Sequence, residues 1–177
     1  MSAPALFAGR DYLQQAWVVA DLDQAMRQWT EVCGVGPFFV LEKAPMENLV
    51  HRGKPIQLDC RVGLAQAGRT QIELIQQRCD SPSIYRDRVP KGQSGFHHIA
   101  AFCNDYDREL AHYQSLDNAL GMAGTFGDMR FAYVDTSATL DCVLELLEDK
   151  PVVRDFFAMI SAAAVNWDGT HPVRPAS

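Results

Sequence analysis

Two stretches of the sequence follow the same plan, and this internal repeat limits the possible folds more than any other feature. Gln14 lies seven residues before Asp21, and His98 lies seven residues before Asp105. In each stretch the polar residue stands near the start of an apolar run typical of a β-strand, and the aspartate is a suitable N-cap for a following helix. The sequence therefore predicts two related strand–helix units.

The two halves also end alike. Each closes with an apolar run that is interrupted by one glutamate, at Glu73 in the first half and at Glu145 in the second. By position, Gln14 and Glu73 are to the first half what His98 and Glu145 are to the second. The pattern predicts an α+β protein built from two paired βαβββ modules.

The repeat divides a single domain, residues 1–177, into consecutive parts. They are the first module (12–77), a connecting loop (78–95), the second module (96–149) and a C-terminal helix with its tail (150–177). In the first module we expect a helix from Asp21 to Gly34 and strands over residues 13–20, 38–42, 56–66 and 70–77. In the second we expect a helix from Asp105 to Gly121 and strands over residues 96–103, 122–126, 129–135 and around Glu145.

The four polar residues inside apolar strands point to a metal site. A lone histidine in such a strand is more often a hydrogen-bonded core residue than a ligand. Burying four polar groups in two symmetric copies is costly unless something binds them. A divalent cation held by the Gln14 amide oxygen, the His98 imidazole and the carboxylates of Glu73 and Glu145 would satisfy all four. By strand alternation His97 faces the opposite side from His98, and we expect it not to be a ligand.

Charge and composition narrow the class of protein. The formal net charge of −6 argues against a nucleic-acid or anionic membrane surface as partner, and no apolar run is long enough to span a membrane. Residues 1–10 lack the charged start of a signal peptide. The five cysteines are odd in number and form no Cys-x-x-Cys pair, as expected of free thiols in a reducing cytoplasm. The sequence favours a cytoplasmic protein without a nucleic-acid or membrane partner.

Two segments leave alternatives open. The connecting loop is the longest stretch without clear periodicity, and its four basic residues against two acidic ones give it a charge of +2. It is either a solvated connector or a lid in which Arg86 or Arg88 binds an anionic group of the substrate. A helix expected over 151–166 is too apolar to be exposed, so it packs either on its own sheet or in a homodimer.

Residues 12–149, with these four positions, resemble the vicinal oxygen chelate superfamily, which includes glyoxalase I, methylmalonyl-CoA epimerase, extradiol dioxygenases and bleomycin-resistance proteins. The resemblance implies that the modules curve into a mixed-sheet half-barrel around a divalent metal on the module dyad. It implies ligands at Gln14 and His98 from the first strands and at Glu73 and Glu145 from the last strands. This set is similar to that of zinc-type glyoxalase I. However, Val18 and Ser94 stand where that family has its glutathione-binding arginines, which indicates a different substrate.

The resemblance implies a metal-dependent glyoxalase-like isomerase, epimerase or lyase that moves a proton next to a carbonyl of a small acyl or CoA-type substrate. The oxygen-rich site suits Zn, Ni, Co, Mn or Mg acting as a Lewis acid. Glu145 is expected to be the general base, and Glu73 the acid or second base. The alternatives are a non-catalytic small-molecule binding protein of the resistance type and an extradiol dioxygenase. A single histidine among the four positions counts against the dioxygenase.

Overall fold

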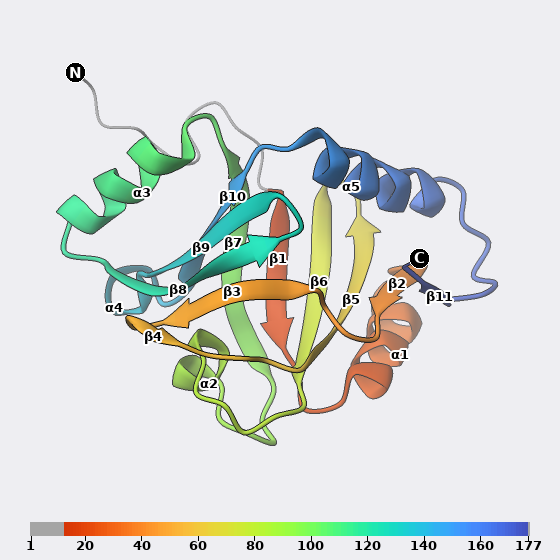
Figure 1. Ribbon diagram of the computed structural model, residues 1–177. Helices are drawn as coiled ribbons and strands as arrows, with labels where there is room; N and C mark the ends of the chain where they lie inside the picture. The colour runs from red at the N-terminus through yellow and green to blue at the C-terminus, as the bar shows by residue number, and fades with distance from the viewer. Residues whose placement is uncertain (1–12, 177) are drawn as a thin grey trace.

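The two predicted modules share one mixed sheet of eleven strands in the computed structural model, which describes residues 13–176 (Figure 1). The strand order is β11-β2-β5-β6-β1-β7-β10-β9-β8-β3-β4. The α+β class and the open, curved sheet are thereby confirmed. The first residues of the chain, where we expect no signal peptide, lie outside the described range.

The first half of the chain supplies six strands and one helix. They are β1 (Gln14–Val18), α1 (Leu22–Cys33), β2 (Phe38–Leu41), β3 (Met46–His51), β4 (Lys54–Pro55), β5 (Cys60–Ala67) and β6 (Thr70–Gln77).

The short helix α2 (Ile84–Arg88) lies in the connecting segment. The second half then supplies β7 (Gly95–Cys103), α3 (Tyr106–Ser115), β8 (Ala119–Phe126), β9 (Met129–Asp135), α4 (Ser137–Leu140) and β10 (Val143–Glu148). The C-terminal part adds α5 (Pro151–Ala164) and β11 (Val173–Pro175).

The sheet is joined at its centre by the first strands of the two modules. β1 and β7 run antiparallel to each other, and each is flanked by the last strand of its own module in parallel orientation, β6 beside β1 and β10 beside β7. The four strands expected to carry the polar residues are therefore consecutive in the sheet.

Both predicted aspartate caps form. The Asp21 carboxylate accepts a hydrogen bond from Gln24 N at 2.9 Å, and the Asp105 carboxylate accepts one from Arg108 N at 3.1 Å. Each bond satisfies one of the backbone donors left free at a helix start. α1 ends at Gly34, whose φ of 65° suits a glycine C-cap.

The segment between β2 and β5 lies mostly outside the strands expected from the sequence, yet it contains β3 and β4. β3 crosses to the other module and pairs with β8, with Met46 opposite Phe126 and His51 opposite Met122. Its register is irregular between Glu47 and Val50, so the strand lacks the two-residue alternation that identifies strands in sequence.

The other differences between the expected and the observed secondary structure involve short or interrupted elements. α2 lies inside the segment expected to be a loop; it has five residues and is capped by Ser83, which accepts a bond from Arg86 N. The helix after Asp105 ends at Ser115 instead of Gly121, because Asp117 adopts a φ of 60° that a helix cannot continue. α4 and β11 are likewise too short to give a periodic signal.

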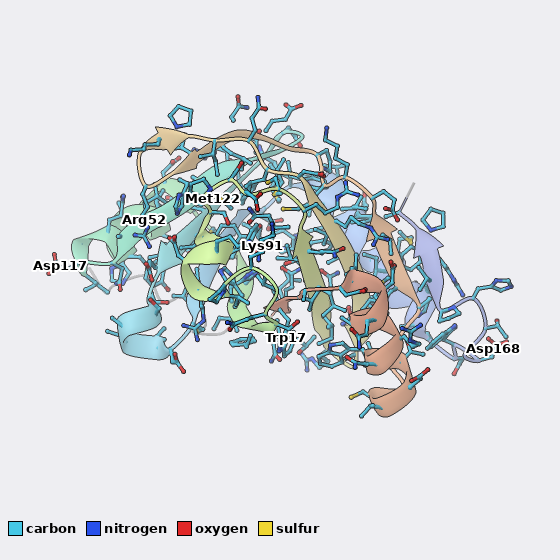
Figure 2. The ribbon with its side chains drawn as sticks, turned by 90° about the horizontal axis from the view of Figure 1, so that it is seen from below. Trp17, Arg52, Lys91, Asp117, Met122 and Asp168 are labelled. Carbon is cyan, nitrogen blue, oxygen red and sulfur yellow. The ribbon has the colours of Figure 1, made fainter. Side chains whose placement is uncertain are left out.

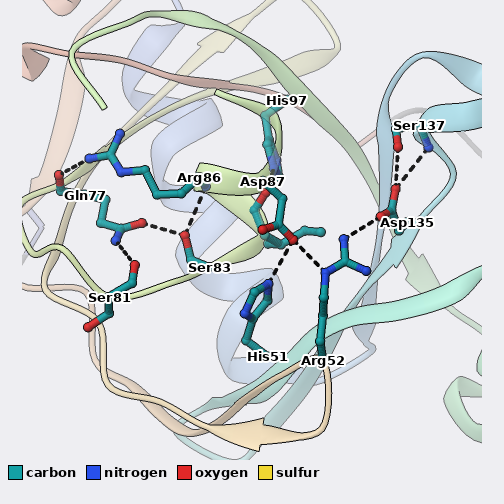
Figure 3. A network of polar contacts seen from close by, with 11 residues as sticks. His51, Arg52, Gln77, Ser81, Ser83, Arg86, Asp87, His97, Asp135 and Ser137 are labelled. Carbon is teal, nitrogen blue, oxygen red and sulfur yellow. Dashed lines mark hydrogen bonds and ion pairs between the residues drawn. The ribbon is translucent and has the colours of Figure 1, made fainter. Parts of the chain in front are cut away.

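A network of hydrogen bonds and ion pairs connects β3 and the turn after it to other parts of the molecule (Figure 3). Arg52, in the turn between these strands, donates to Asp87 of α2 and to Asp135 of β9, each at 2.8 Å. His51 Nε2 lies 2.9 Å from the same Asp87 carboxylate. The turn of the first module is thus bonded to the connecting segment and to the second module.

The helices divide the core into an inner and an outer part. α1 packs on the outer face of β5 and β6, and α3 packs on the outer face of β9 and β10. Seen from below, Asp117, which follows α3, and Asp168, which follows α5, lie at opposite ends of the molecule (Figure 2). Among the described residues, no helix is long and apolar enough to cross a membrane.

α5 closes the inner core. It lies across the ends of β5 and β6 (Figure 1), and its apolar side chains, Val153, Phe156, Phe157 and Ile160, pack against the inner core cluster. The helix therefore packs on its own sheet, which is one of the two predicted alternatives; the homodimer remains a prediction.

We expect Ile160→Ala to lower the free energy of unfolding by about 2–5 kcal/mol, because it leaves a cavity in the inner core. Ile160 is 0% exposed, whereas Met159 on the same helix is 40% exposed. Met159→Ala is the matched control and should cost far less. Urea unfolding followed by circular dichroism measures both, and equal losses would contradict the packing of α5 described here.

Candidate metal centre

The sheet register brings the four predicted residues to the middle of the inner face. Across the central strands, Glu73, Ala16 and His98 are aligned in one row. Gln14, Ala100 and Glu145 are aligned in the next. In each row a small alanine separates two large polar side chains, which leaves room for the polar groups to lean toward a common point.

Two of these side chains, both carboxylates, converge on a nitrogen of the third, His98. His98 Nε2 lies 3.1 Å from Glu145 Oε2 and 3.3 Å from Glu73 Oε2. The candidate ligand atoms of the three residues all lie within 4.8 Å of one another. Neither contact has hydrogen-bond geometry, and both His98 Nε2 and Glu73 Oε2 are buried without a hydrogen-bond partner among the described residues. Unpartnered buried ligand atoms of this kind fit a bound cation.

The electrostatics of the cluster also favour a cation. Burial raises the pKa of Glu73, and the neighbouring His98 only partly offsets this effect. Burial alone would lower the pKa of His98, but the charges and contacts of Glu145 and Glu73 raise it to about 9. In the absence of a metal ion the imidazole thus carries a proton between two carboxylates, and a divalent cation can take the place of that proton.

His97 does not face away from His98, so the expectation based on strand alternation is wrong. The β1–β7 register passes from Ala16 opposite His98 directly to Trp17 opposite Phe96, which leaves His97 as the extra residue of a β-bulge. The bulge turns both histidines to the inner face, with ring centroids 5.1 Å apart.

The bonds of His97 fix which nitrogen of His98 faces the cluster. His97 Nε2 lies 3.0 Å from the Ile84 carbonyl oxygen, which can only accept, so Nε2–H donates. Burial lowers the pKa of His97 to about 3, so the ring is neutral and its Nδ1 must accept. His98 Nδ1, 2.8 Å away, is then the donor. This series of hydrogen bonds directs His98 Nε2 to the carboxylates, and it engages both ring nitrogens of His97.

Gln14 is held by a second glutamine that sequence reasoning did not single out. Gln14 Nε2 donates to Gln71 Oε1 at 2.8 Å, which leaves the Gln14 carbonyl oxygen for the cavity, and both residues are buried. Gln71 precedes Glu73 by two residues on the same strand face, and that spacing is the signal that could have identified it.

Two buried tyrosines complete the polar part of the site, and they too were missed. The hydroxyl groups of Tyr85 (α2) and Tyr133 (β9) lie 3.1 Å apart. Burial raises the pKa of both phenols well above 10, so both are protonated. Tyr133 lies directly opposite Glu145 in the sheet, a position that could be deduced only after the register was known.

The cluster opens into a small cavity of about 80 Å³. Apart from the polar residues described above, its walls are apolar and come from both modules and α5: Leu41, Ala44, Met46, Val62, Leu64, Phe126, Met129, Phe131, Leu147, Val153, Phe156 and Phe157. Glu73 and Glu145 are the charged residues of the lining.

Arg86 and Arg88 do not line this cavity. Arg86 donates to the Gln77 carbonyl oxygen at 2.8 Å (Figure 3). Arg88 donates to the Phe96 carbonyl oxygen and contacts Asp141. Both arginines fix the connecting segment to its neighbours, and their role in binding substrate stays a prediction.

Comparison with known proteins agrees with this architecture. The model of the glyoxalase/bleomycin resistance protein/dioxygenase superfamily matches residues 13–133, about two thirds of the chain. The chain belongs to this superfamily. The match includes Gln14, Glu73 and His98 and ends before Glu145. A search of curated proteins by sequence finds no significant match.

Solved structures show the same fold at low sequence identity. Methylmalonyl-CoA epimerase from Mycobacterium tuberculosis is 20% identical with a TM-score of 0.56, covering 88% of this chain and 97% of its own. A variant of the Streptomyces coelicolor methylmalonyl-CoA epimerase in complex with 2-nitronate-propionyl-CoA is 15% identical with a TM-score of 0.51, covering 80% and 95%. A hypothetical protein from Bacillus halodurans is 15% identical with a TM-score of 0.50, covering 79% and 94%. Enzymes of the superfamily usually use a divalent metal, and the unpartnered atoms of Glu73 and His98 fit one.

We expect His98→Ala to abolish stoichiometric binding of Zn²⁺ or Co²⁺, because it removes the nitrogen on which both carboxylates converge. His97→Ala should keep the site but weaken metal affinity by about 10–100-fold, because it removes the acceptor that orients His98. His112→Ala, on the distant helix α3, is the control. Equilibrium dialysis with elemental analysis measures all three, and wild-type metal content in His98→Ala would remove His98 from the site.

Proposed function

We propose that this protein is a metal-dependent enzyme that transfers a proton at a carbon next to a carbonyl, as an isomerase, epimerase or lyase of the glyoxalase type. The observation that carries the proposal is the convergence of two carboxylates, the largely buried Glu73 and the buried Glu145, on His98 Nε2. Moving a proton on and off carbon requires a base and an acid beside one bound atom, and this pair can supply both.

The Gln14 carbonyl oxygen, His98 Nε2 and oxygens of Glu73 and Glu145 would hold the cation, whose identity among Zn, Ni, Co, Mn and Mg is open. When bound, the ion polarises the substrate carbonyl and stabilises the negative charge that develops on its oxygen. Glu145 takes the proton from carbon as general base. Glu73, the second carboxylate beside His98 Nε2, serves as the acid or second base.

The cavity supports a small substrate with an uncharged, apolar substituent. Among residues 13–176 its lining contains no cationic side chain, and its volume of about 80 Å³ suits a short acyl group. A CoA-type substrate would place only its acyl end in the cavity and leave the remainder outside. An anion-binding role for Arg86 or Arg88 would then apply outside the cavity and would compete with the backbone bonds that these side chains make now.

The apolar cavity also supports the second candidate, a non-catalytic protein that binds a small molecule. Extradiol dioxygenation is less well supported, because the cluster offers one imidazole where the usual iron site has two histidines and a carboxylate. Free thiols at all five cysteines fit a cytoplasmic location. A homodimer remains part of the proposal.

We expect the metal-loaded protein to exchange deuterium from solvent into the carbon next to the substrate carbonyl. Mass spectrometry can screen 2-oxo-thiohemiacetals, 2-methylacyl-CoA esters and related acids without knowledge of the product. Glu145→Gln should retain metal but lose exchange by about 100-fold or more, because an amide is no base. Gln14→Glu is the milder control, because it removes no proposed acid or base.

Different outcomes separate the alternatives. Full exchange by Glu145→Gln would move the general base to Glu73. Metal-dependent binding of small molecules without exchange of any substrate would favour the binding protein. If turnover consumed dioxygen and required ferrous iron, the reaction would be a dioxygenation, and the proposal of proton transfer would be wrong.

A further inference from the structure

The two modules contribute different walls to the metal centre, although they share one plan. On the second-module side, Tyr133 of β9 lies directly opposite Glu145 of β10. On the first-module side, the equivalent strand β5 places Leu64 opposite Glu73 of β6. Directly opposed residues in an antiparallel pair have their Cβ atoms about 5 Å apart, so each carboxylate has one fixed neighbour. Glu145 has a phenol beside it, and Glu73 has an aliphatic side chain.

Tyr133 is packed into the centre of the cluster. Its ring centroid lies 5.0 Å from that of His98 and 6.0 Å from that of His97, in edge-to-face arrangements. Tyr85, from the connecting segment, packs edge-to-face on both Tyr133 and His97. Both tyrosines line the cavity, so the phenol pair is part of the wall that a substrate meets.

The hydrogen bonds of the pair leave one proton available. The two hydroxyl groups, 3.1 Å apart, use one proton for the bond between them. If Tyr133 is the donor, the proton of Tyr85 has only the Met46 thioether sulfur, at 3.9 Å, and sulfur is a weak acceptor. If Tyr85 is the donor, the proton of Tyr133 is free for an acceptor in the cavity. A negatively charged substrate oxygen is a much stronger acceptor than a thioether and favours the second arrangement.

We propose that Tyr133, positioned by Tyr85, donates a hydrogen bond to the substrate oxygen that becomes negative during proton transfer, and that the apolar substituent of the substrate lies against the Leu64 wall. This inference rests on the proposed function and adds the orientation of the substrate. Tyr133 is then a catalytic residue, and Tyr85 is a positioning residue. The substrate class is a small compound with one oxygen that becomes negative next to the reacting carbon and a short apolar substituent.

A purely structural role for the pair makes a different prediction. Two buried phenols that only satisfy each other would affect stability when one is removed, with no effect on a ligand in the cavity. A donor to the substrate oxygen affects ligand affinity even when folding and metal content are unchanged. The decisive measurement is therefore the binding of a small anionic chelator to the folded, metal-loaded protein.

The probe is acetohydroxamate, which carries two chelating oxygens and one methyl group and is small enough for the cavity. Its affinity for the Zn²⁺- or Co²⁺-loaded protein is measured by isothermal titration calorimetry in the wild type, Tyr133→Phe, Tyr85→Phe and the control Tyr106→Phe. Tyr106 is a buried tyrosine at the start of α3, outside the cavity. We expect Tyr133→Phe to weaken binding by about tenfold or more, as for a lost bond to a charged group. Tyr85→Phe should have a smaller effect, and Tyr106→Phe should have none. Metal content should be equal in all four proteins.

Orientation is tested by a second comparison. Leu64→Ala enlarges the cavity at its apolar wall. The variant should therefore have a higher affinity for butyrohydroxamate relative to acetohydroxamate than the wild type. Tyr133→Phe should leave this ratio unchanged. A ratio unaffected by Leu64→Ala would overturn the proposed orientation.

The outcomes also separate this inference from the proposed function. If the wild type binds metal and acetohydroxamate and folded Tyr133→Phe binds the probe within about twofold of wild type, the assignment of Tyr133 is wrong and the proposed function stands. If the wild type takes up no divalent metal and does not bind the probe, the proposed function fails, and the role of Tyr133 fails with it.

Discussion

The antiparallel pairing of β1 with β7 is the constraint on which the rest of the structure depends. It joins the two modules, and it sets side by side the four strands that carry Gln14, Glu73, His98 and Glu145. A slip of one residue in this pairing would turn Gln14 to the outer face of the sheet while leaving His98 inside. Ala16 and Ala100 occupy the positions between the polar side chains, so the same register that aligns the strands also provides the space for a cation.

The polar cluster is tolerated in the core because its members compensate one another. Two imidazoles and the Glu145 carboxylate are buried at the centre of the inner face, with the Glu73 carboxylate largely buried beside them, under a helix that contributes phenylalanines and aliphatic side chains. Removing single charged groups from water is costly without a partner. His98 is the common partner of both carboxylates, and His97 fixes its orientation through the Ile84 carbonyl. The connecting segment that supplies Ile84 and Tyr85 is therefore part of the site, although neither Arg86 nor Arg88 lines the cavity.

Sequence periodicity was sufficient for the regular part of the fold, because each repeated strand and capped helix carries its own local signal. Asp21 and Asp105 identified the helix starts, and the isolated glutamates identified the last strands. The remaining features depend on contacts between distant segments. The pairing of β3 with β8 has no regular alternation, and the bulge at His97 is defined only by the strand opposite. Tyr133 joins the site because the register sets it beside Glu145, and Arg86 and Arg88 are engaged by backbone carbonyls that no charge count reveals.

The two edge strands of the sheet bear on how copies of this chain can associate. In the described part of the chain, β4 forms one edge with two residues, Lys54 and Pro55, and β11 forms the other with three residues ending in Pro175. Proline cannot donate to a neighbouring strand, and edges this short offer few free backbone groups. Both ends of the sheet are therefore poor templates for a further strand. The described edges therefore favour a dimer that buries side-chain surfaces on helices or loops over one that continues the sheet from one molecule into the next.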